Sequence, residues 1–326
     1  EIYTLSLHDA LPISKVSETT FILKGGNTLE QLQIWDSHVH LFPPEIYNNW
    51  ETYAARDSWF GVLTKKPENH KGTEEAWANA EEALDCATQA GIHGLVMQGW
   101  YWNDAGLMRM HNDYMAESIK NHPERLKGFI SINPKFKKEA IAEIERCAKL
   151  GFSGIGELGP GGNGYDFNDP DFIEVVECAN AYHLPINIHC GEPVGHPYPG
   201  KDMTSLAPLP GLILKYPDVT FILAHMGGGL PFYELNPRYH GKFKNVYYDT
   251  AANPLLYHIS SFRAVIGLIG SKRLLYGSDF PLLLYPSKNR EMDFSMFVNQ
   301  IRNDACLSKE EWNDVMGNNL RRILDI

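Results

Sequence analysis

The stretch "LGFSGIGELG", residues 150–159, joins the end of a helical segment to a short apolar run that ends in a glutamate. Gly151 follows the helical segment, where glycine commonly ends a helix, and the residues after it are typical of a buried strand. The stretch "YHLPINIHC", residues 182–190, repeats the joint one unit later, with His189 at the end of its apolar run. Such helix–short loop–strand joints indicate repeated β/α units.

Eight short runs of β-forming residues are spread along the chain, with helical segments between them. The predicted strands are 33–40, 93–99, 126–132, 153–158, 185–190, 219–225, 245–250 and 273–279. The predicted helices are 73–90, 104–121, 137–150, 169–182 and a tail that opens with a capping box at Ser308 and Glu311. No Gly-x-Gly-x-x-Gly follows the first strand. The pattern predicts a single-domain (β/α)8 TIM barrel rather than a doubly wound sheet.

Two segments fall outside this repeat. Residues 1–14, "EIYTLSLHDALPIS", resemble a translated sequencing adapter, so we expect residues 1–15 to be a non-native leader and the barrel domain to cover 16–326. Residues 41–72 form a long insertion after the first strand, with several aromatic residues among prolines and charges. A long loop at this position is often functional, and we interpret it as a lid.

Composition excludes several classes of function. The chain has 29 Lys and Arg against 40 Asp and Glu, a net charge of −11, which disfavours a nucleic-acid-binding surface. Its 5 cysteines contain no C-x-x-C pair and are typical of a reducing compartment. No apolar stretch is long enough to cross a membrane, and no signal peptide is recognised. We therefore expect a cytoplasmic protein that acts on a small molecule without nucleic acid or membrane.

Metal-competent side chains stand at the ends of the predicted strands. "DSHVH", residues 36–40, places Asp36, His38 and His40 on one side of the first strand. The fourth, fifth, sixth and eighth strands end in Glu157, His189, His225 and Asp279. Because the carboxyl ends of barrel strands meet at one face, these side chains are expected to converge. Imidazole and carboxylate groups bind divalent ions such as zinc, and a further His or Asp beside the ion can move a proton.

The motifs "DSHVHLF", "GIGELG", "LPINIHCGEP", "FILAHMGGG" and "LLYGSDFPL" together resemble the amidohydrolase superfamily. The similarity is to its amidohydrolase-related branch, which includes enzymes of the aminocarboxymuconate-semialdehyde decarboxylase type. The resemblance implies a divalent ion, with zinc expected and one or two ions left open. It implies His38, His40, His189 and Asp279 as ligands, Asp279 also as a proton carrier, and His225 as a catalytic residue that orients water or binds a second ion. It is also compatible with a homodimer.

The residue at the end of the fourth strand departs from many binuclear members of the superfamily, which carry a modified lysine there. Glu157 stands at this position and is predicted as a further metal ligand, with a substrate contact or a supporting hydrogen bond as the open alternatives. Trp100, His196 and Tyr198 follow the second and fifth strands and are predicted to contact substrate. For Asp249, at the end of the seventh strand, a turn cap and a functional role stay equally open.

The main functional hypothesis is hydrolysis of a small amide, ester or lactone by a metal-activated water. The alternative is a non-oxidative decarboxylase of a carboxylated aromatic or enoic acid. That reaction needs a cation near the leaving carboxylate, for which Lys201 and Arg238 are the sequence candidates. A third reading is a metal-binding barrel without catalysis, and the presence of both His225 and Asp279 speaks against it.

Overall fold

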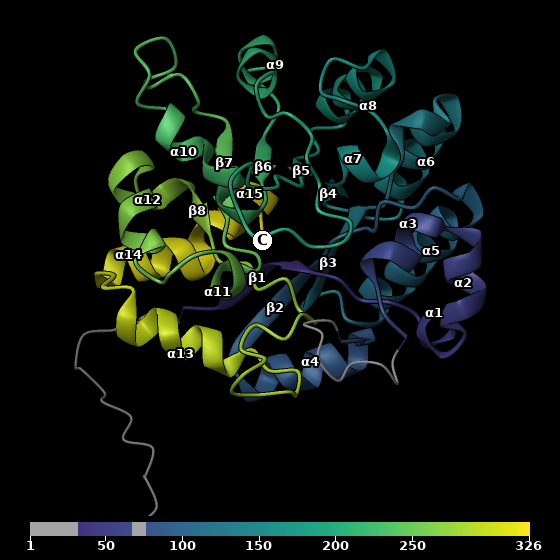
Figure 1. Cartoon of the computed structure of the whole chain (residues 1–326), viewed down its shortest axis with the longest axis horizontal. Helices are drawn as coiled ribbons and strands as arrows, with labels where there is room; N and C mark the ends of the chain where they lie inside the picture. The colour runs from purple at the N-terminus through teal and green to yellow at the C-terminus, as the bar shows by residue number, and fades with distance from the viewer. Residues whose placement is uncertain (1–31, 67–75) are drawn as a thin grey trace, which may run out of the picture. The chain divides into compact units, whose positions relative to one another are not determined.

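The computed structural model describes residues 32–66 and 76–326, and the predicted leader lies outside them. Within the described residues, eight parallel strands form one sheet in the order β1 to β8. A parallel bridge between Val39 and Phe280 brings the two edges together, so the predicted (β/α)8 barrel is confirmed (Figure 1). The strands are β1 (Ile34–Val39), β2 (Ile92–Met97), β3 (Leu126–Ile130), β4 (Gly154–Leu158), β5 (Ile186–Ile188), β6 (Phe221–Leu223), β7 (Val246–Asp249) and β8 (Leu274–Leu275).

Helices surround the strands in Figure 1, and the four central predicted helices are present at slightly different bounds. The first of them starts later than predicted, because Asn79 caps it in a box with Glu82. The α-helices are α1 (Pro44–Asn48), α2 (Trp50–Arg56), α3 (Ser58–Leu63), α4 (Ala80–Gln89), α5 (Ala105–Asn121), α6 (Lys138–Lys149), α7 (Pro160–Asn163), α8 (Pro170–Ala181), α9 (Leu209–Lys215), α10 (Leu230–Tyr233), α11 (Asn253–Leu256), α12 (Ser261–Ile269), α13 (Ser295–Asp304), α14 (Lys309–Asn313) and α15 (Asn319–Leu324).

The insertion after β1 is helical where a loop was expected. Its described part contains α1, α2 and α3, and the last predicted residues of the lid, 67–72, lie outside the described residues. Asp57 caps α3 by accepting hydrogen bonds from the backbone N–H groups of Trp59 and Phe60. Phe60 is fully buried and contacts Trp77 and Trp102, so the segment packs on the barrel through its aromatic residues.

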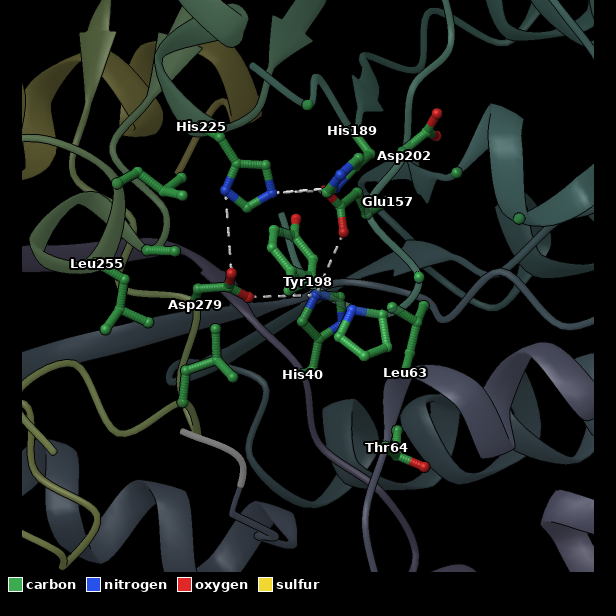
Figure 2. A pocket seen from close by; sticks show the side chains of 18 of the residues that line it. His40, Leu63, Thr64, Glu157, His189, Tyr198, Asp202, His225, Leu255 and Asp279 are labelled. Carbon is green, nitrogen blue, oxygen red and sulfur yellow. Dashed lines mark hydrogen bonds and ion pairs between the residues drawn. The ribbon is translucent and has the colours of Figure 1, made fainter. Parts of the chain in front are cut away.

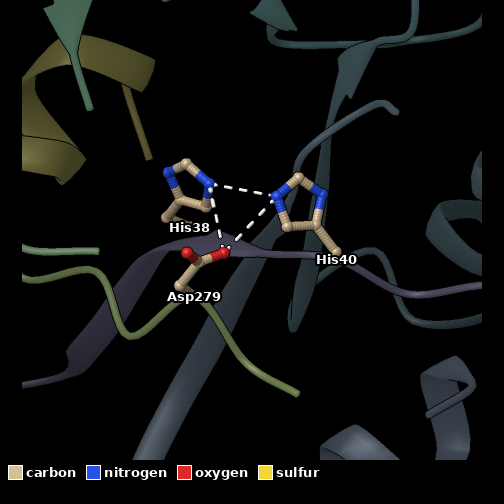
Figure 3. Close-up of side chains that lie close together, drawn as sticks. All are labelled: His38, His40 and Asp279. Atoms are coloured by element: carbon tan, nitrogen blue, oxygen red, sulfur yellow. Dashed lines mark hydrogen bonds and ion pairs between the residues drawn. The ribbon is translucent and has the colours of Figure 1, made fainter. Parts of the chain in front are cut away.

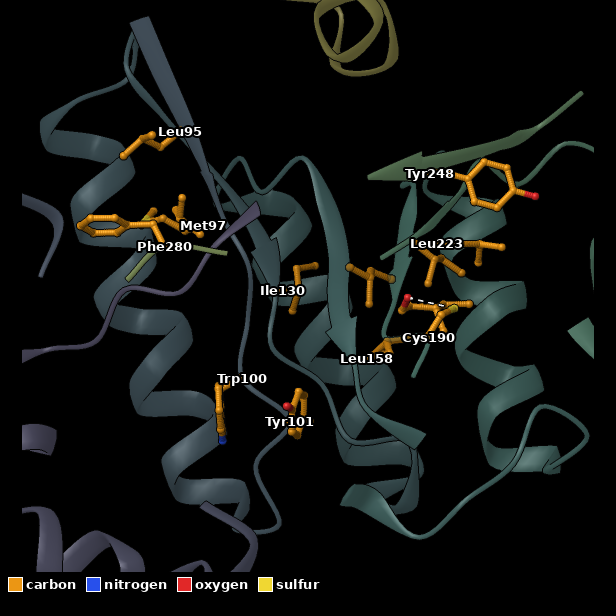
Figure 4. Packing of buried hydrophobic residues seen from close by; sticks show 14 of the residues in the cluster. Leu95, Met97, Trp100, Tyr101, Ile130, Leu158, Cys190, Leu223, Tyr248 and Phe280 are labelled. Carbon is orange, nitrogen blue, oxygen red and sulfur yellow. Dashed lines mark hydrogen bonds between the residues drawn. The ribbon is translucent and has the colours of Figure 1, made fainter. Parts of the chain in front are cut away.

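Two groups of apolar side chains stabilise the barrel. The larger group fills the space between strands and helices and includes Leu95, Ile130 and Leu223 (Figure 4). The smaller group has Trp35, Val96, Phe129, Ile222 and Leu275, which come from five strands around the ring and contact one another. They therefore fill the barrel interior, as the layers of a TIM barrel do.

Glycines make room for the two large rings inside the barrel. A Cβ atom at Gly94 would lie 2.5 Å from the Trp35 ring, and one at Gly154 would lie 2.5 Å from the Phe129 ring. Leu320 of α15 joins the same interior group, so the last helix closes one end of the barrel. The polar residues at the carboxyl ends of the strands lie at the opposite end of the barrel. Among the described residues, no helix has the length and apolarity needed to cross a bilayer.

Candidate metal centre and active site

The strand order brings all six predicted metal-site side chains to one end of the barrel. His38 lies in β1 and His40 just after it, Glu157 lies in β4, and His189 directly follows β5. The other two follow β6 and β8 in the chain: His225 and Asp279. These residues form two groups of three, His38 with His40 and Asp279, and Glu157 with His189 and His225. Within each group the ligand atoms lie within 4.8 Å of one another.

The first group converges on a single point (Figure 3). The Nε2 atoms of His38 and His40 are 3.2 Å apart, and the Asp279 Oδ1 atom lies 3.7 Å and 3.5 Å from them. Atoms that bind one ion at about 2.1 Å in tetrahedral or octahedral geometry lie about 3.0 to 3.4 Å apart. The separations are only slightly larger, so the donor set fits a divalent ion.

Glu157 connects the two groups through its two carboxylate oxygens. Its Oε2 atom lies 3.6 Å from His38 Nε2 and 3.4 Å from His40 Nε2. Its Oε1 atom lies 2.9 Å from His189 Nδ1 and 3.3 Å from His225 Nε2. Burial alone would raise the pKa of this carboxyl, but His189 and His38 hold the pKa well below its usual range. Glu157 is therefore a carboxylate that faces four histidines.

Asp249 orients His38 from below the site, a role that the sequence left open. Its Oδ2 atom accepts hydrogen bonds from His38 Nδ1 at 2.9 Å and from Asn187 Nδ2 at 3.1 Å. With Nδ1 donating to Asp249, the Nε2 atom of His38 keeps a lone pair directed at His40 and Asp279. Burial opposes the charge of Asp249, yet the neighbouring His38 keeps the pKa of the carboxyl below its ordinary value. The carboxylate thus leaves the His38 Nε2 lone pair available to a metal ion.

His225 is held by a backbone turn that few residues other than glycine adopt. His225 and Met226 have φ of 56° and 55°, and Gly227 follows with φ of 60°. A Cβ atom at Gly227 would lie 2.7 Å from the Tyr248 ring. The His225 Nδ1 atom is 3.0 Å from the Ala251 carbonyl oxygen, which leaves Nε2 facing Glu157 and His189. The motif "HMGGG" is therefore both a tight turn and part of the site, and the strained backbone is typical of functional positions.

Charge around His225 favours its protonated form. Burial lowers the pKa of the imidazole, but the hydrogen bond and the negative charge of Glu157, with that of Asp279, raise it to about 9. The Asp279 Oδ2 atom lies 4.0 Å from His225 Nδ1, while Oδ1 of the same carboxylate faces His38 and His40. Asp279 therefore lies between the pair His38 and His40 on one side and His225 on the other.

A cavity of about 550 Å³ opens above these residues (Figure 2). His40, Glu157, His189, His225 and Asp279 line it, whereas His38 is completely buried beneath it. The three predicted substrate-contact residues all line the cavity as well: Trp100, His196 and Tyr198. Further aromatic walls come from Phe42, Trp59, Trp77, Tyr101 and Tyr257. The cavity therefore combines a polar floor with aromatic walls.

Neither of the two sequence-predicted cations stands free in the cavity. Lys201 Nζ lies 3.1 Å from Glu192 Oε1, and both side chains are largely buried. Arg238 is exposed in the segment after α10 and does not line the cavity. Among the described residues that line the cavity, Lys65, from the insertion after β1, is the one lysine or arginine. The lysine at the cavity therefore comes from the insertion after β1. The motifs at the strand ends do not include this segment, so they could not predict it.

Sequence comparison identifies the family. The profile of the amidohydrolase family matches residues 35–326, which is most of the chain. The chain belongs to this family. A 2-amino-3-carboxymuconate-6-semialdehyde decarboxylase of Dictyostelium discoideum is 26% identical over 243 residues, which cover 64% of this chain and 60% of that protein. A γ-resorcylate decarboxylase of Polaromonas sp. strain JS666 is 26% identical over 252 residues, which cover 63% of this chain and 73% of that protein.

Solved structures of the same fold include further decarboxylases. A 5-carboxyvanillate decarboxylase from Novosphingobium aromaticivorans, in complex with manganese and 4-hydroxy-3-methoxy-5-nitrobenzoic acid, superposes with a TM-score of 0.69 at 15% identity. The superposition covers 90% of this chain and 96% of that one. A 2,6-dihydroxybenzoate decarboxylase with bound 2,6-dihydroxybenzoate gives a TM-score of 0.62 at 19% identity, over 91% and 100% of the two chains. At these identities the likeness establishes the fold.

These comparisons correct the functional prediction. The predicted hydrolysis of an amide, ester or lactone is wrong, because the curated relatives described above are decarboxylases, and the two solved structures described above carry the same activity in their names. An enzyme of the amidohydrolase superfamily is supported. The hydrolase and the decarboxylase readings share one set of histidines and carboxylates at the strand ends, so those motifs did not distinguish the two reactions.

Proposed function

We propose that the protein is a metal-dependent, non-oxidative decarboxylase that releases CO2 from a small carboxylated aromatic or enoic acid. The observation that carries the proposal is the cavity, whose aromatic walls stand over a floor of histidines and carboxylates. Aromatic walls favour a flat, unsaturated substrate. The alignment spans only 60% of the Dictyostelium relative, so its activity is carried to this chain as part of the proposal.

The proposed ligands are His38, His40, Glu157, His189 and Asp279. A bound divalent cation supplies positive charge that polarises the oxygens of the substrate. The Nε2 atoms of His38 and His40 and one carboxylate oxygen each from Glu157 and Asp279 lie at similar separations from one another. This donor set suits zinc or manganese. His189 stands on the other side of Glu157, so a second ion there would share this carboxylate. Measured metal stoichiometry distinguishes one ion from two.

The remaining chemistry belongs to the residues of the chain. When the carboxylate leaves as CO2, the electrons of the broken C–C bond stay on the substrate carbon, which takes up a proton. We assign this proton to His225, which passes it to the substrate carbon through the Asp279 carboxyl, whose Oδ2 atom lies 4.0 Å from His225 Nδ1. After the transfer His225 is neutral and Asp279 is again a carboxylate. No water is consumed, so the role of orienting a nucleophilic water, predicted for His225, does not apply to this reaction.

The proposal is tested by measuring metal content and CO2 release. Protein loaded with zinc or with manganese is incubated with 2,6-dihydroxybenzoate, with 5-carboxyvanillate and with 2-amino-3-carboxymuconate-6-semialdehyde. We expect CO2 and the decarboxylated product from at least one acid, with loss of metal in the His38→Ala/His189→Ala double variant. Asp279→Asn should lose at least 100-fold in rate, as removal of general acid–base groups typically costs ~10²–10⁴-fold.

A matched substitution controls for the loss of one carboxylate. Asp304, at the end of α13, is exposed and does not line the cavity. Asp304→Asn should therefore retain full activity. Full metal occupancy in the double histidine variant, or no CO2 from any of the three acids under both metals, would contradict the proposal.

A further inference from the structure

The chain between β5 and α9 forms a closed loop beside the cavity. Residues 191–202, the β5 loop, run as bends, turns and irregular backbone, and the two ends of the loop meet, because a Cβ atom at Gly191 would overlap the Asp202 carbonyl oxygen. The Asp202 carboxylate fixes this junction by accepting hydrogen bonds from the backbone N–H groups of Gly161 at 2.9 Å and Thr204 at 2.7 Å. Surface loops with close ends are frequently functional.

Ionised side chains, rather than apolar ones, fill the inside of the β5 loop. Val194 is 92% exposed and Tyr198 is 41% exposed, whereas the side chains of Glu192 and Lys201 are 10% and 7% exposed. An apolar cluster therefore does not hold the loop together. Buried charges are stable when they are paired and hydrogen-bonded, so the shape of the loop depends on this lysine and this glutamate.

The ammonium group of Lys201 connects the end of the β5 loop with its start and its middle. Its Nζ atom lies 3.1 Å from Glu192 Oε1 and donates a hydrogen bond to the His196 carbonyl oxygen at 3.3 Å. The same atom lies 5.9 Å from the centre of the Tyr198 ring, within the range of a cation–π contact. One side chain thus contacts both predicted substrate contacts of this loop, His196 through its backbone and Tyr198 through its ring.

The β5 loop also packs on the insertion after β1. Gly200 has φ of 79°, and a Cβ atom there would overlap the Leu63 side chain of α3 and lie 3.3 Å from Val62 Cγ1. Leu63 and Tyr198 are both among the side chains that line the cavity (Figure 2). The loop and α3 therefore form adjoining walls of the cavity, and a displaced loop changes the cavity without a change at the strand ends.

We infer that Lys201 is a positioning residue, which holds His196 and Tyr198 at the cavity by joining Glu192 to the His196 backbone. For its effect on catalysis, this role rests on the proposed function. The ammonium group was a candidate to face the leaving carboxylate, and here it acts inside the loop instead. When the loop is not held, binding of a substrate has to order these side chains first, which costs affinity. The proton transfer from His225 through Asp279 does not involve the loop.

The test replaces Lys201 by methionine, which is similar in length and lacks the ammonium group. Hydrogen–deuterium exchange of the backbone amides of residues 191–202 is measured on metal-loaded protein without substrate, and CO2 release is measured with the acids named above. We expect these amides to exchange about 10-fold faster while the amides of the strands are unchanged. KM should rise about 10- to 100-fold, because two more side chains are ordered on binding, and kcat and metal content should change by less than about 3-fold.

Two further variants separate positioning from other effects of the lost charge. Lys135→Met is the matched control, because Lys135 Nζ also joins two acceptors, Asp169 Oδ2 and Asp171 Oδ2, both at 2.9 Å, and the residue does not line the cavity. It should leave the exchange of the β5 loop and KM unchanged. The Lys201→Met/Glu192→Gln double variant has neither charge, so a lysine that only neutralises Glu192 would be dispensable in it. We expect fast exchange of the loop and a raised KM to persist in the double variant.

Several results would overturn the positioning role. They are unchanged exchange of the β5 loop in Lys201→Met, faster exchange with an unchanged KM, or recovery of both quantities in the double variant. Absence of CO2 release from every acid in the unchanged protein would overturn the proposed function and the catalytic part of this role with it. The exchange measurement needs no substrate, so it still decides in that case whether Lys201 holds the loop.

Discussion

Replacement of Asp249 by asparagine is the sharpest test of how the barrel prepares its metal site. Asp249 is completely buried at the end of β7 and contacts both halves of the site. Its Oδ2 atom accepts from His38 Nδ1 at 2.9 Å, and its Oδ1 atom accepts from the backbone N–H groups of His225 and Ala251 at 3.0 Å and 3.1 Å. Both oxygens of the Asp249 carboxylate accept hydrogen bonds, whereas an asparagine side chain has one oxygen and one NH2 group. The NH2 group of the variant would therefore face either the His38 ring or the two backbone N–H groups.

The expected magnitude follows from these contacts. Loss of the carboxylate lowers the basicity of His38 and frees its ring to rotate away from the ligand position. Removing a hydrogen-bonded partner of this kind typically weakens metal binding by about 10- to 100-fold, which corresponds to about 1.4 to 2.8 kcal/mol. Folding stability should also fall, by about 1 to 3 kcal/mol, because a buried donor is left facing another donor.

The assay is a titration of metal-free protein with zinc and with manganese in competition with a chromophoric chelator. Asp314→Asn is the matched control, since Asp314 is buried as well but accepts from Ser271 Oγ, in the segment between α12 and β8. We expect Asp249→Asn to weaken binding of both metals and Asp314→Asn to leave it unchanged. Equal metal affinity in Asp249→Asn and in the control would refute the orienting role of the carboxylate.

Three further outcomes can be checked by unfolding and by activity. Removal of metal with a chelator should lower Tm and abolish CO2 release, and added zinc or manganese should restore both, since a ligand that binds only the folded state stabilises it. Burial lowers the pKa of His111 from 6.5 to about 4. The contribution of this histidine to stability is therefore complete above pH 6.5 and falls by about 3 kcal/mol as the pH drops toward 4. The urea-unfolding free energy of His111→Gln should depend less on pH over this range, and parallel pH profiles of the two proteins would contradict the assignment. Gly227→Ala should destabilise the protein by about 1 to 3 kcal/mol, because the residue has φ of 60° and its new Cβ would lie 2.7 Å from the Tyr248 ring; an unchanged Tm would show that the turn tolerates a side chain.

The strands and the residues at their ends could be predicted from sequence because both depend on local pattern. A buried parallel strand requires a short apolar run, and each of the eight predicted runs overlaps a strand of the barrel. Once eight β/α units are present, their geometry places His38, Glu157, His189 and the other strand-end residues at one face. The insertion after β1 lacks such a repeat, which explains why α1, α2 and α3 were not predicted.

Partners distant in the chain could not be predicted in this way. Asp249 meets His38 across 211 positions, and only closure of the barrel brings β7 beneath β1. Lys201, a candidate cation in the sequence, is paired with Glu192 in the folded chain. Hydrolysis and decarboxylation use the same donors, so the motifs left the reaction open.

The sequence by itself thus determined the barrel and which side chains meet at its open end, since periodicity and strand order are properties of the chain. The tertiary structure decided which nitrogen of His38 faces His40 and Asp279, and that Lys201 is paired with Glu192. Those features depend on distances of about 3 Å between side-chain atoms, because hydrogen bonds act only over that range.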